Sequence, residues 1–260
     1  MKTLNNILLL TFISIFALNL TSCSDDKDEE TRFSDMNMST GTKEEIKNGD
    51  GLTWRSENDL IASVSGSVVN AIRKGSVMIA SDKGSFKVTV TPSHTLFSDP
   101  CLEWGSSVDD VKSFMEGYSL YGEADEGLFY NGNGAVGYIG YIFKNAKLES
   151  AGVYVKTVYM EDLVEHLNER YVHFGEEENE AFYFISPDKN MLVILTAQKL
   201  GNSYYYLVMF TKAESSSTAK DIMTKSMKPA FGSVIKNNES TKQEDCQRLM
   251  QKLEQKIVIE

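Results

Sequence analysis

GLTWRSENDLIASVSGSVVNAIRKGSVMIASDKGSFKVTV, residues 51–90, alternates short apolar runs with polar turns. Apolar side chains recur at every second position, most clearly at Phe86, Val88 and Val90, and glycine-containing pairs such as Ser65-Gly66 separate the runs. A period of two is typical of strands that bury one face, and the glycines favour tight turns. The stretch therefore predicts an all-β sandwich over residues 33–92.

The same region resembles the group 2 bacterial immunoglobulin-like (BIG2) domains. The matching elements occur in the family's order and are WRSENDLIASV (54–64), GSVVNAIRKG (66–75), VMIA (77–80) and FKVTV (86–90). The N-terminal strand, within FSDMNMSTGTKEEIKNGDG (33–51), is weak and polar, so a trimmed sandwich is expected. The resemblance implies a spacer or adhesion module of a bacterial surface protein, and it implies no catalytic residues.

Residues 93–213 have a different pattern of apolar positions. Ser106 or Ser107 is a candidate N-cap for a first helix, and an apolar stripe of helical spacing predicts a second helix at residues 159–174. The expected strands read GYIGYIF (137–143), LESAGVYV (148–155), AFYFIS (181–186), MLVILTAQ (191–198) and SYYYLVMFTK (203–212). This order predicts an α+β domain, an antiparallel sheet with helices on one face.

The strand-turn-strand YIFKNAKLESAGVYV (141–155) within that order resembles the two-fold helix-plus-sheet domains of the β-lactamase-inhibitor type. Small lipoproteins of outer-membrane assembly machines share the layout. The resemblance covers nearly half the chain, and it rests on the order of elements more than on a motif. It implies protein binding across an open sheet face and brings no site residues with it.

The N-terminus predicts an anchor. An apolar segment from Ile7 to Leu20 follows Lys2, and it is short of the roughly 20 apolar residues of a membrane span, which favours a signal peptide over residues 1–22. Leu20-Thr21-Ser22-Cys23 resembles the lipobox of bacterial lipoproteins. That resemblance implies cleavage before Cys23 and acyl chains, such as palmitate, on its sulfur and new amine; two or three chains anchor a protein stably.

An acidic tether, residues 23–32, follows this cysteine. Its SDDKDEE stretch (24–30) resembles the export signal that sends lipoproteins of one Gram-negative group to the outer face of the outer membrane; a plain solvated tether is the alternative. The formal net charge of −11 excludes the basic footprint of a nucleic-acid-binding protein. The expected partners are the lipid bilayer, through Cys23, and an extracellular protein or glycan.

Two further cysteines, Cys101 and Cys246, could form one disulfide in an oxidising compartment or remain two free thiols. Cys246 belongs to a C-terminal segment, residues 214–260, that contains an amphipathic helix pattern over Leu249, Met250, Leu253 and Ile257. This helix could dock on the sheet or fray.

The motifs that suggest chemistry are weak. GNGAVG (132–137) spells a dinucleotide fingerprint, but a strand and not a helix follows it, so a turn is expected. Asp162, His166, Glu169 and His173 share a helical stripe that could bind a metal, and a solvated polar face is the favoured interpretation. The acidic runs GEADEG (122–127) and GEEENE (175–180) are expected to be loops. No cofactor, metal or catalytic residue is predicted, and no enzyme activity.

Aromatic strands are the preferred functional feature. Tyr204, Tyr205 and Tyr206 send alternate rings to opposite faces, so an open tyrosine-rich face could bind a partner. The sequence therefore predicts a lipid-anchored protein of the outer membrane, exposed at the cell surface, that binds an extracellular protein or glycan. The alternative is an envelope accessory or assembly factor that binds an outer-membrane complex.

Overall fold

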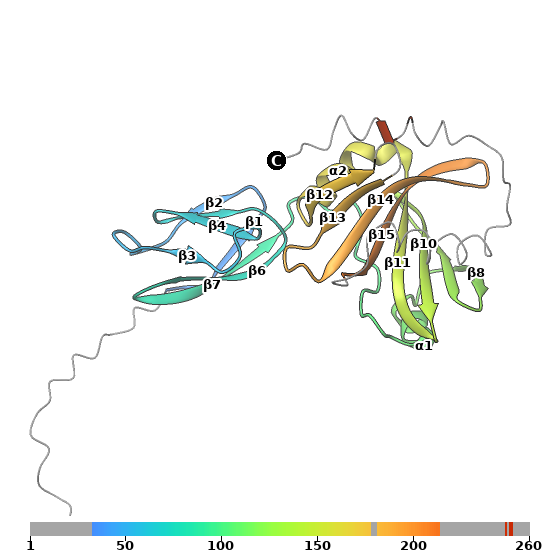
Figure 1. Ribbon diagram of the computed structural model, residues 1–260, viewed down its shortest axis with the longest axis horizontal. Coiled ribbons are helices and arrows are strands. Elements are labelled where there is room, and N and C mark those ends of the chain that lie inside the picture. The colour runs from blue at the N-terminus through green and yellow to red at the C-terminus, as the bar shows by residue number, and fades with distance from the viewer. Residues whose placement is uncertain (1–32, 178–180, 214–247, 249, 252–260) are drawn as a thin grey trace, which may run out of the picture. The chain divides into compact units, whose positions relative to one another are not determined.

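Strands dominate the fold. The computed structural model describes residues 33–177, 181–213, 248, 250 and 251, and Figure 1 labels most of their elements. The N-terminal region contains two sheets. One has four strands in the order β1-β7-β6-β3, and the other has three in the order β2-β5-β4. The strands are β1 (Met36–Ser39), β2 (Lys43–Glu45), β3 (Arg55–Ser56), β4 (Ala62–Ser65), β5 (Val68–Ala71), β6 (Gly75–Ser81) and β7 (Gly84–Thr91).

These two sheets share one hydrophobic core. Phe86, Val88 and Val90 of β7 are buried at alternate positions, and they pack with Val69 of the smaller sheet. Trp54 closes the core, with its ring 5.5 Å from that of Phe86 and its indole N–H donating to the Gly49 carbonyl at 3.0 Å. The period-two pattern of residues 51–90 thus corresponds to strands that bury one face.

The expectation of a trimmed N-terminal edge was wrong. β1 pairs in parallel with β7, Met36 opposite Val88, and buries Met36 and Met38 in the core. β2 pairs with β5 although all three of its residues are exposed. A short edge strand can be held by alternate buried apolar residues, as in β1, or by backbone hydrogen bonds alone, as in β2. The sequence of such a strand is therefore largely polar.

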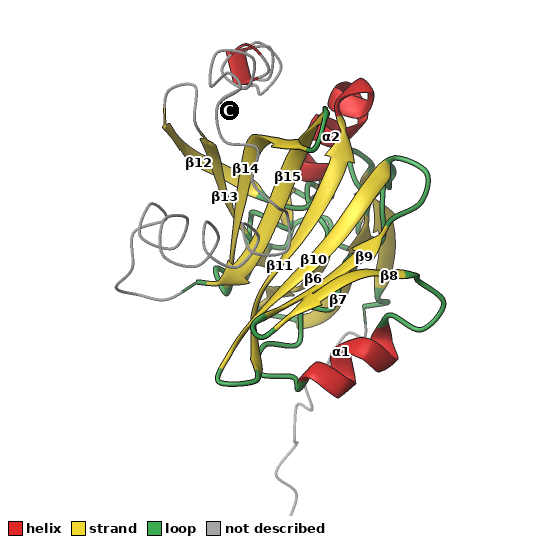
Figure 2. Ribbon diagram, turned by 90° about the vertical axis from the view of Figure 1, so that its right-hand side faces the viewer, coloured by secondary structure: helices red, strands yellow, loops and turns green. Residues whose placement is uncertain are grey.

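The third sheet has eight antiparallel strands in the order β12-β13-β14-β15-β11-β10-β9-β8, which run side by side in Figure 2. It consists of two halves with the same order of elements, a helix followed by four strands. The first half is α1 (Val108–Phe114), β8 (Leu120–Ala124), β9 (Gly127–Asn131), β10 (Val136–Lys144) and β11 (Lys147–Lys156). The second is α2 (Met160–Asn168), preceded by a 3-10 turn (Thr157–Tyr159), then β12 (Val172–Glu177), β13 (Ala181–Ile185), β14 (Met191–Leu200) and β15 (Ser203–Lys212).

The last strands of the two halves, β11 and β15, pair at the centre of the sheet, with Val153 opposite Val208. Both helices contribute to one core cluster with the sheet: Val111 from α1 and Leu163 and Leu167 from α2 are fully buried there. We call the sheet face that belongs to this cluster the helix face. Met250, which has helical backbone, is buried in the same cluster.

The opposite face of the sheet, which we call the second face, is also buried at its centre. Tyr154, Ile194 and Leu207 have no exposed surface there. The expectation of an open sheet face was therefore wrong for the centre of this sheet. Any surface that this face offers to a partner lies toward its ends.

Local patterns gave some elements correctly and others not. Ser107 is the N-cap of α1, and a two-residue turn with positive φ at Asn145 and Ala146 joins β10 to β11, as expected. α2 ends at Asn168, earlier than its apolar stripe predicted. The acidic runs are not simply loops, because Gly122–Ala124 lies in β8 and Gly175–Glu177 in β12.

Candidate functional site

Three tyrosines form a surface cluster at one end of the second face. Tyr121 of β8, Tyr138 of β10 and Tyr205 of β15 stand in a row, which we call the tyrosine cluster. The Tyr121 and Tyr138 ring centroids are 5.2 Å apart and those of Tyr138 and Tyr205 are 5.6 Å apart, both edge to face. Such geometry is favourable because the positive edge of one ring meets the negative face of the next.

Two more rings support the cluster from the interior. Phe129 is stacked on Tyr138 at 5.3 Å, and Tyr154 packs edge to face against Phe129 at 5.4 Å and against Tyr205 at 6.4 Å. Phe129 and Tyr154 are buried, whereas Tyr121 is 56% exposed and Tyr138 and Tyr205 are half-buried. The visible rings are thus fixed on a buried aromatic base.

Gly137 allows Tyr205 to occupy its place. A Cβ atom at residue 137 would lie 2.5 Å from Cε1 of Tyr205, far inside van der Waals contact. The absence of a side chain on β10 lets the ring lie across the strand. Gly137 is the third glycine of GNGAVG, so the glycine that suggested a nucleotide site instead makes room for an aromatic ring.

The Tyr138 hydroxyl is neutral near neutral pH. Burial raises the pKa of Tyr138 above its ordinary value, and the neighbouring Tyr205 and Tyr121 raise it further. A neutral phenol both donates and accepts a hydrogen bond. Tyr138 can therefore bind hydroxyl or amide groups, and its raised pKa leaves no phenolate there that could act as a base or nucleophile near neutral pH.

Two polar side chains flank the rings. Asn131 of β9 lies opposite Tyr138, and Lys156 of β11 lies opposite Tyr205. Each polar side chain therefore lies on the same face of the sheet as the tyrosine opposite it. The Asn131 amide nitrogen donates to the carbonyl and hydroxyl oxygens of Ser119 at 3.3 and 3.0 Å. The Lys156 ammonium donates to the Gly134 carbonyl at 2.7 Å, which ties the turn before β10 to β11.

Of the three tyrosines predicted as a binding face, only Tyr205 belongs to this cluster. Tyr206 projects to the helix face, where it is 1% exposed and where burial raises its pKa to about 12, so the prediction is wrong for Tyr206 as a contact residue. Tyr204 alternates with Tyr205, and the Lys199 ammonium lies 5.6 Å from its ring centroid. Sequence reasoning missed Tyr121 and Tyr138, because only the strand register brings them beside Tyr205.

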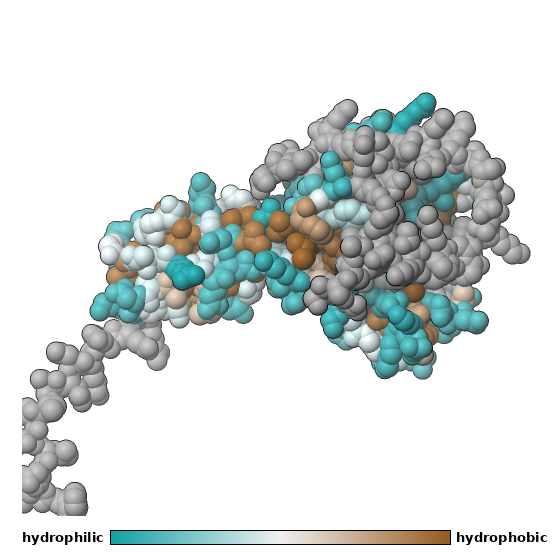
Figure 3. Space-filling view, viewed as in Figure 1, coloured by the Kyte–Doolittle hydropathy of each residue, from teal (hydrophilic) through white to brown (hydrophobic). Residues whose placement is uncertain are grey.

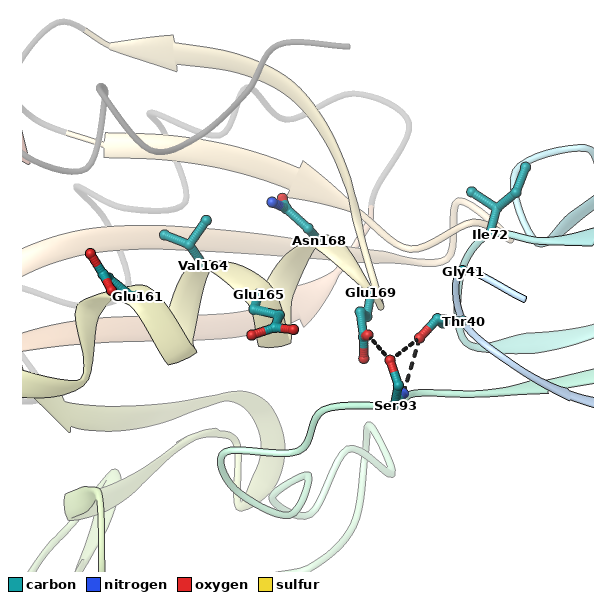
Figure 4. Close-up of a pocket in the computed structure, with 9 residues that line it drawn as sticks. All are labelled: Thr40, Gly41, Ile72, Ser93, Glu161, Val164, Glu165, Asn168 and Glu169. Carbon is teal, nitrogen blue, oxygen red and sulfur yellow. Dashed lines mark hydrogen bonds between the residues drawn. The ribbon is translucent and has the colours of Figure 1, made fainter. Parts of the chain in front are cut away.

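A cleft lies beside α2. This cleft of about 620 Å³ is lined by Thr40, Gly41, Ile72, Ser93, Glu161, Val164, Glu165, Asn168 and Glu169 (Figure 4). Its carboxylates come from successive turns of α2. Glu169 accepts hydrogen bonds from the Ser93 hydroxyl and the His94 N–H, and its own carbonyl accepts from the Lys74 N–H at 2.8 Å. Burial alone would raise the pKa of Glu169, but these hydrogen bonds outweigh it and lower the pKa.

Glu169 is thus one of several contacts between the N-terminal region and the eight-stranded sheet. The Arg73 Nε donates to the Tyr171 carbonyl at 3.1 Å, and the Asn58 amide donates to the Pro187 carbonyl at 2.9 Å. Lys74 also forms an ion pair with Asp99. Glu169, Ser93 and Thr40 of the cleft are therefore already hydrogen-bonded within the chain's own structure, which makes the cleft a weaker candidate than the tyrosine cluster.

The histidine stripe is not a ligand set. His166 is fully buried in α2, with Nδ1 accepting from the Leu96 N–H at 3.2 Å and its ring 4.1 Å from Phe97, whereas His173 lies outside the helix in β12. The expectation of a solvated polar face was also wrong for His166. Within the described ranges, no group of three or more histidine, cysteine or acidic side chains is placed to hold a metal ion.

The remaining predicted residues are separated or lie outside the described part. Cys101 is buried, and its backbone N–H donates to the Tyr141 hydroxyl at 3.2 Å. Cys246 and Cys23 lie outside the described residues, as do the signal segment and the acidic tether, so the disulfide and the lipid anchor stay predictions. Arg248 and Gln251 are exposed beside the buried Met250, as an amphipathic helix requires.

Exposed apolar side chains also lie between α1 and β8. Phe114, Tyr118 and Leu120 are between 37% and 54% exposed, and they lie in the short segment that leads from α1 into β8. Figure 3 shows brown side chains among teal ones around this end of the sheet.

Neither helix of the described residues has the length and apolar content to cross a membrane. Comparisons with protein-family models, with curated proteins and with solved structures give no match to this chain.

Proposed function

We propose that this chain is an outer-membrane lipoprotein, held by acyl chains on Cys23, that binds an extracellular partner without chemical conversion. The observation that carries the binding role is the tyrosine cluster. Its rings are fixed on a buried aromatic base, and Tyr121 is more than half exposed. Fixed aromatic side chains with neutral hydroxyls are effective contact groups because little conformational entropy is lost on binding.

The architecture supports a finer assignment within this proposal. Two sheets around one core at residues 36–91 suit an immunoglobulin-like spacer over residues 33–92. Two successive helix-plus-four-strand halves suit an α+β domain of the β-lactamase-inhibitor layout over residues 93–213. In this arrangement the acidic tether and the spacer hold the binding domain away from the bilayer.

Surface protease shaving tests the location. Intact cells that express the full chain are treated with protease, with lysed cells as the control for cleavability. We expect cleavage of the wild type on intact cells, and reduced cleavage when the acids of SDDKDEE (24–30) are replaced by neutral amides. A Cys23→Ser variant should leave the membrane fraction. Protection of the wild type on intact cells would contradict surface exposure and favour the inward-facing accessory role.

A further inference from the structure

We propose that the ligand of the tyrosine cluster is a carbohydrate, with a sugar ring stacked on Tyr121 and its hydroxyls bound by Tyr138, Tyr205, Asn131 and Lys156. This inference rests on the proposed binding function and adds the chemical class of the ligand. It draws on the placement of the rings, on the polar groups beside them and on the size of the surface.

The rings offer the contact that a sugar needs. The face of an aromatic ring carries negative potential, which attracts the polarised C–H groups on the apolar side of a pyranose. Tyr121 contacts both Phe129, at 5.8 Å, and Tyr138, at 5.2 Å, so its exposed ring is fixed from two sides. A weak ligand gains most from a site of this kind, because the side chains lose little freedom on binding.

The polar groups complete the match. Asn131 uses its amide nitrogen for Ser119, so within the described part of the chain its Oδ1 is left to accept from a ligand. Lys156 uses one of its three N–H groups for Gly134 and keeps two as donors. With the tyrosine hydroxyls, the surface presents both donors and acceptors, which the vicinal hydroxyls of a sugar require.

The size of the surface favours a carbohydrate over a protein. A stable protein interface takes about 800 Å² and 20–30 residues from each partner, with an apolar centre from which lysine is depleted. The tyrosine cluster and its two flanking side chains are five residues, one of them a lysine, and the centre of the second face next to them is buried. This surface fits an oligosaccharide of a few rings.

Affinity electrophoresis tests the inference. The full chain, purified in detergent, is run through native gels that contain starch, xylan, glucomannan or chondroitin sulfate. We expect retardation of the wild type by at least one polysaccharide. Tyr121→Ala should weaken that binding about tenfold, equal to about 1.4 kcal/mol, while Tyr121→Phe should retain most of it, because the stacked ring remains.

The controls separate binding from folding. Phe174, in β12 at the opposite edge of the sheet, is 55% exposed, so Phe174→Ala removes a matched aromatic ring and should leave binding unchanged. Gly137→Ala should displace Tyr205 and weaken binding although no contact group is removed. Unfolding temperatures identify any variant that fails to fold, and Tyr121→Phe then serves as the informative variant, because loss of binding there would contradict a stacked ring.

Three outcomes would overturn the inference. The first is a wild-type chain that no polysaccharide retards, and the second is retardation that Tyr121→Ala and Phe174→Ala leave equal. The third is capture of a protein that depends on Tyr121 in the absence of glycan. Each outcome leaves surface exposure standing if protease reaches the chain on intact cells, so failure of the carbohydrate inference is distinguishable from failure of the proposed function.

Discussion

The two halves of the eight-stranded sheet have the same order of elements, but they hold their helices differently. α1 has seven residues, a complete capping box at Ser107 and one buried side chain, Val111. α2 has nine residues and four buried side chains, including Leu163, and its N-cap, Tyr159, makes no side-chain capping hydrogen bond within the described residues. One helix is defined mainly by local hydrogen bonds and the other mainly by burial.

This difference shows that topology does not fix the source of stability. Capping contributes on the order of 1 kcal/mol, whereas burial of one leucine contributes several times that amount. α2 also connects its half of the sheet to the N-terminal region, because the carbonyl of Glu169, its C-cap, accepts from the Lys74 N–H at 2.8 Å. We expect the second helix to matter more for global stability and the first for local order.

Truncation of the buried side chains of the two helices should give the largest loss of stability. Leu163→Ala should lower the free energy of unfolding by about 2–5 kcal/mol, since it leaves a cavity at a fully buried site, and Val111→Ala should cost less because fewer carbon atoms are removed. Urea unfolding followed by circular dichroism measures both. Val158→Ala, at an 83% exposed site, is the control and should change stability by less than about 0.5 kcal/mol. An equal or larger loss for Val111→Ala would contradict the comparison.

Sequence patterns predicted the elements better than their lengths or partners. The cap at Ser107 could be recognised because all its atoms lie within four residues, Ser107 to Asp110. The end of α2 could not, because Tyr171 and Phe174 continue the helical spacing while the chain has already turned toward β12. A periodic stripe cannot tell a residue that continues a helix from one that packs or is exposed after it.

The tyrosine cluster shows the same limit at the candidate site. Each of its rings comes from a different strand, and Tyr121 sits at a register shift between Leu120 and Gly122. The sequence predicts that adjacent tyrosines alternate between faces, which correctly separates Tyr205 from Tyr206. It does not give the order of strands, in which β15 joins β11, and only that order brings Tyr205 to Tyr138.

The buried histidine of α2 gives an effect of intermediate size. Burial lowers the pKa of His166 to about 3, and the charges of Arg170, His94 and Lys74 act in the same direction. Between about pH 6.5 and pH 3 the unfolded chain binds a proton that the folded chain excludes, so stability falls as the pH is lowered through this window. The loss at pH 5 should reach about 2 kcal/mol. α1 contains no histidine, so this pH dependence distinguishes the two helices.

The measurement is urea unfolding at a series of pH values from 7.5 to about 5, above the range in which the carboxylates titrate. The wild type is compared with His166→Gln, which removes the titrating group and keeps an acceptor that can face the Leu96 N–H. The variant should be less stable at pH 7.5, and its free energy of unfolding should depend less on pH. An identical slope for the two proteins would show that another group causes the loss, and the contrast with α1 would then lose this support.

The smallest expected effect tests the cap of α1. In the wild type the Asp110 N–H donates to the Ser107 hydroxyl oxygen at 3.2 Å, and the Ser107 N–H donates to the Asp110 carboxylate at 2.9 Å. The Ser107 hydroxyl also donates to the Asp110 carboxylate at 2.7 Å, and the two hydrogen bonds that Ser107 donates to this carboxylate lower the pKa of Asp110. Ser107→Ala should therefore cost about 1 kcal/mol and raise the pKa of Asp110, which NMR titration of its carboxyl carbon detects. Ser106→Ala is the matched control, because the Ser106 hydroxyl donates only to the Glu103 carbonyl before the helix. If both variants left the Asp110 pKa unchanged, α1 would depend on its buried face, as α2 does, and the two halves would differ in degree rather than in kind.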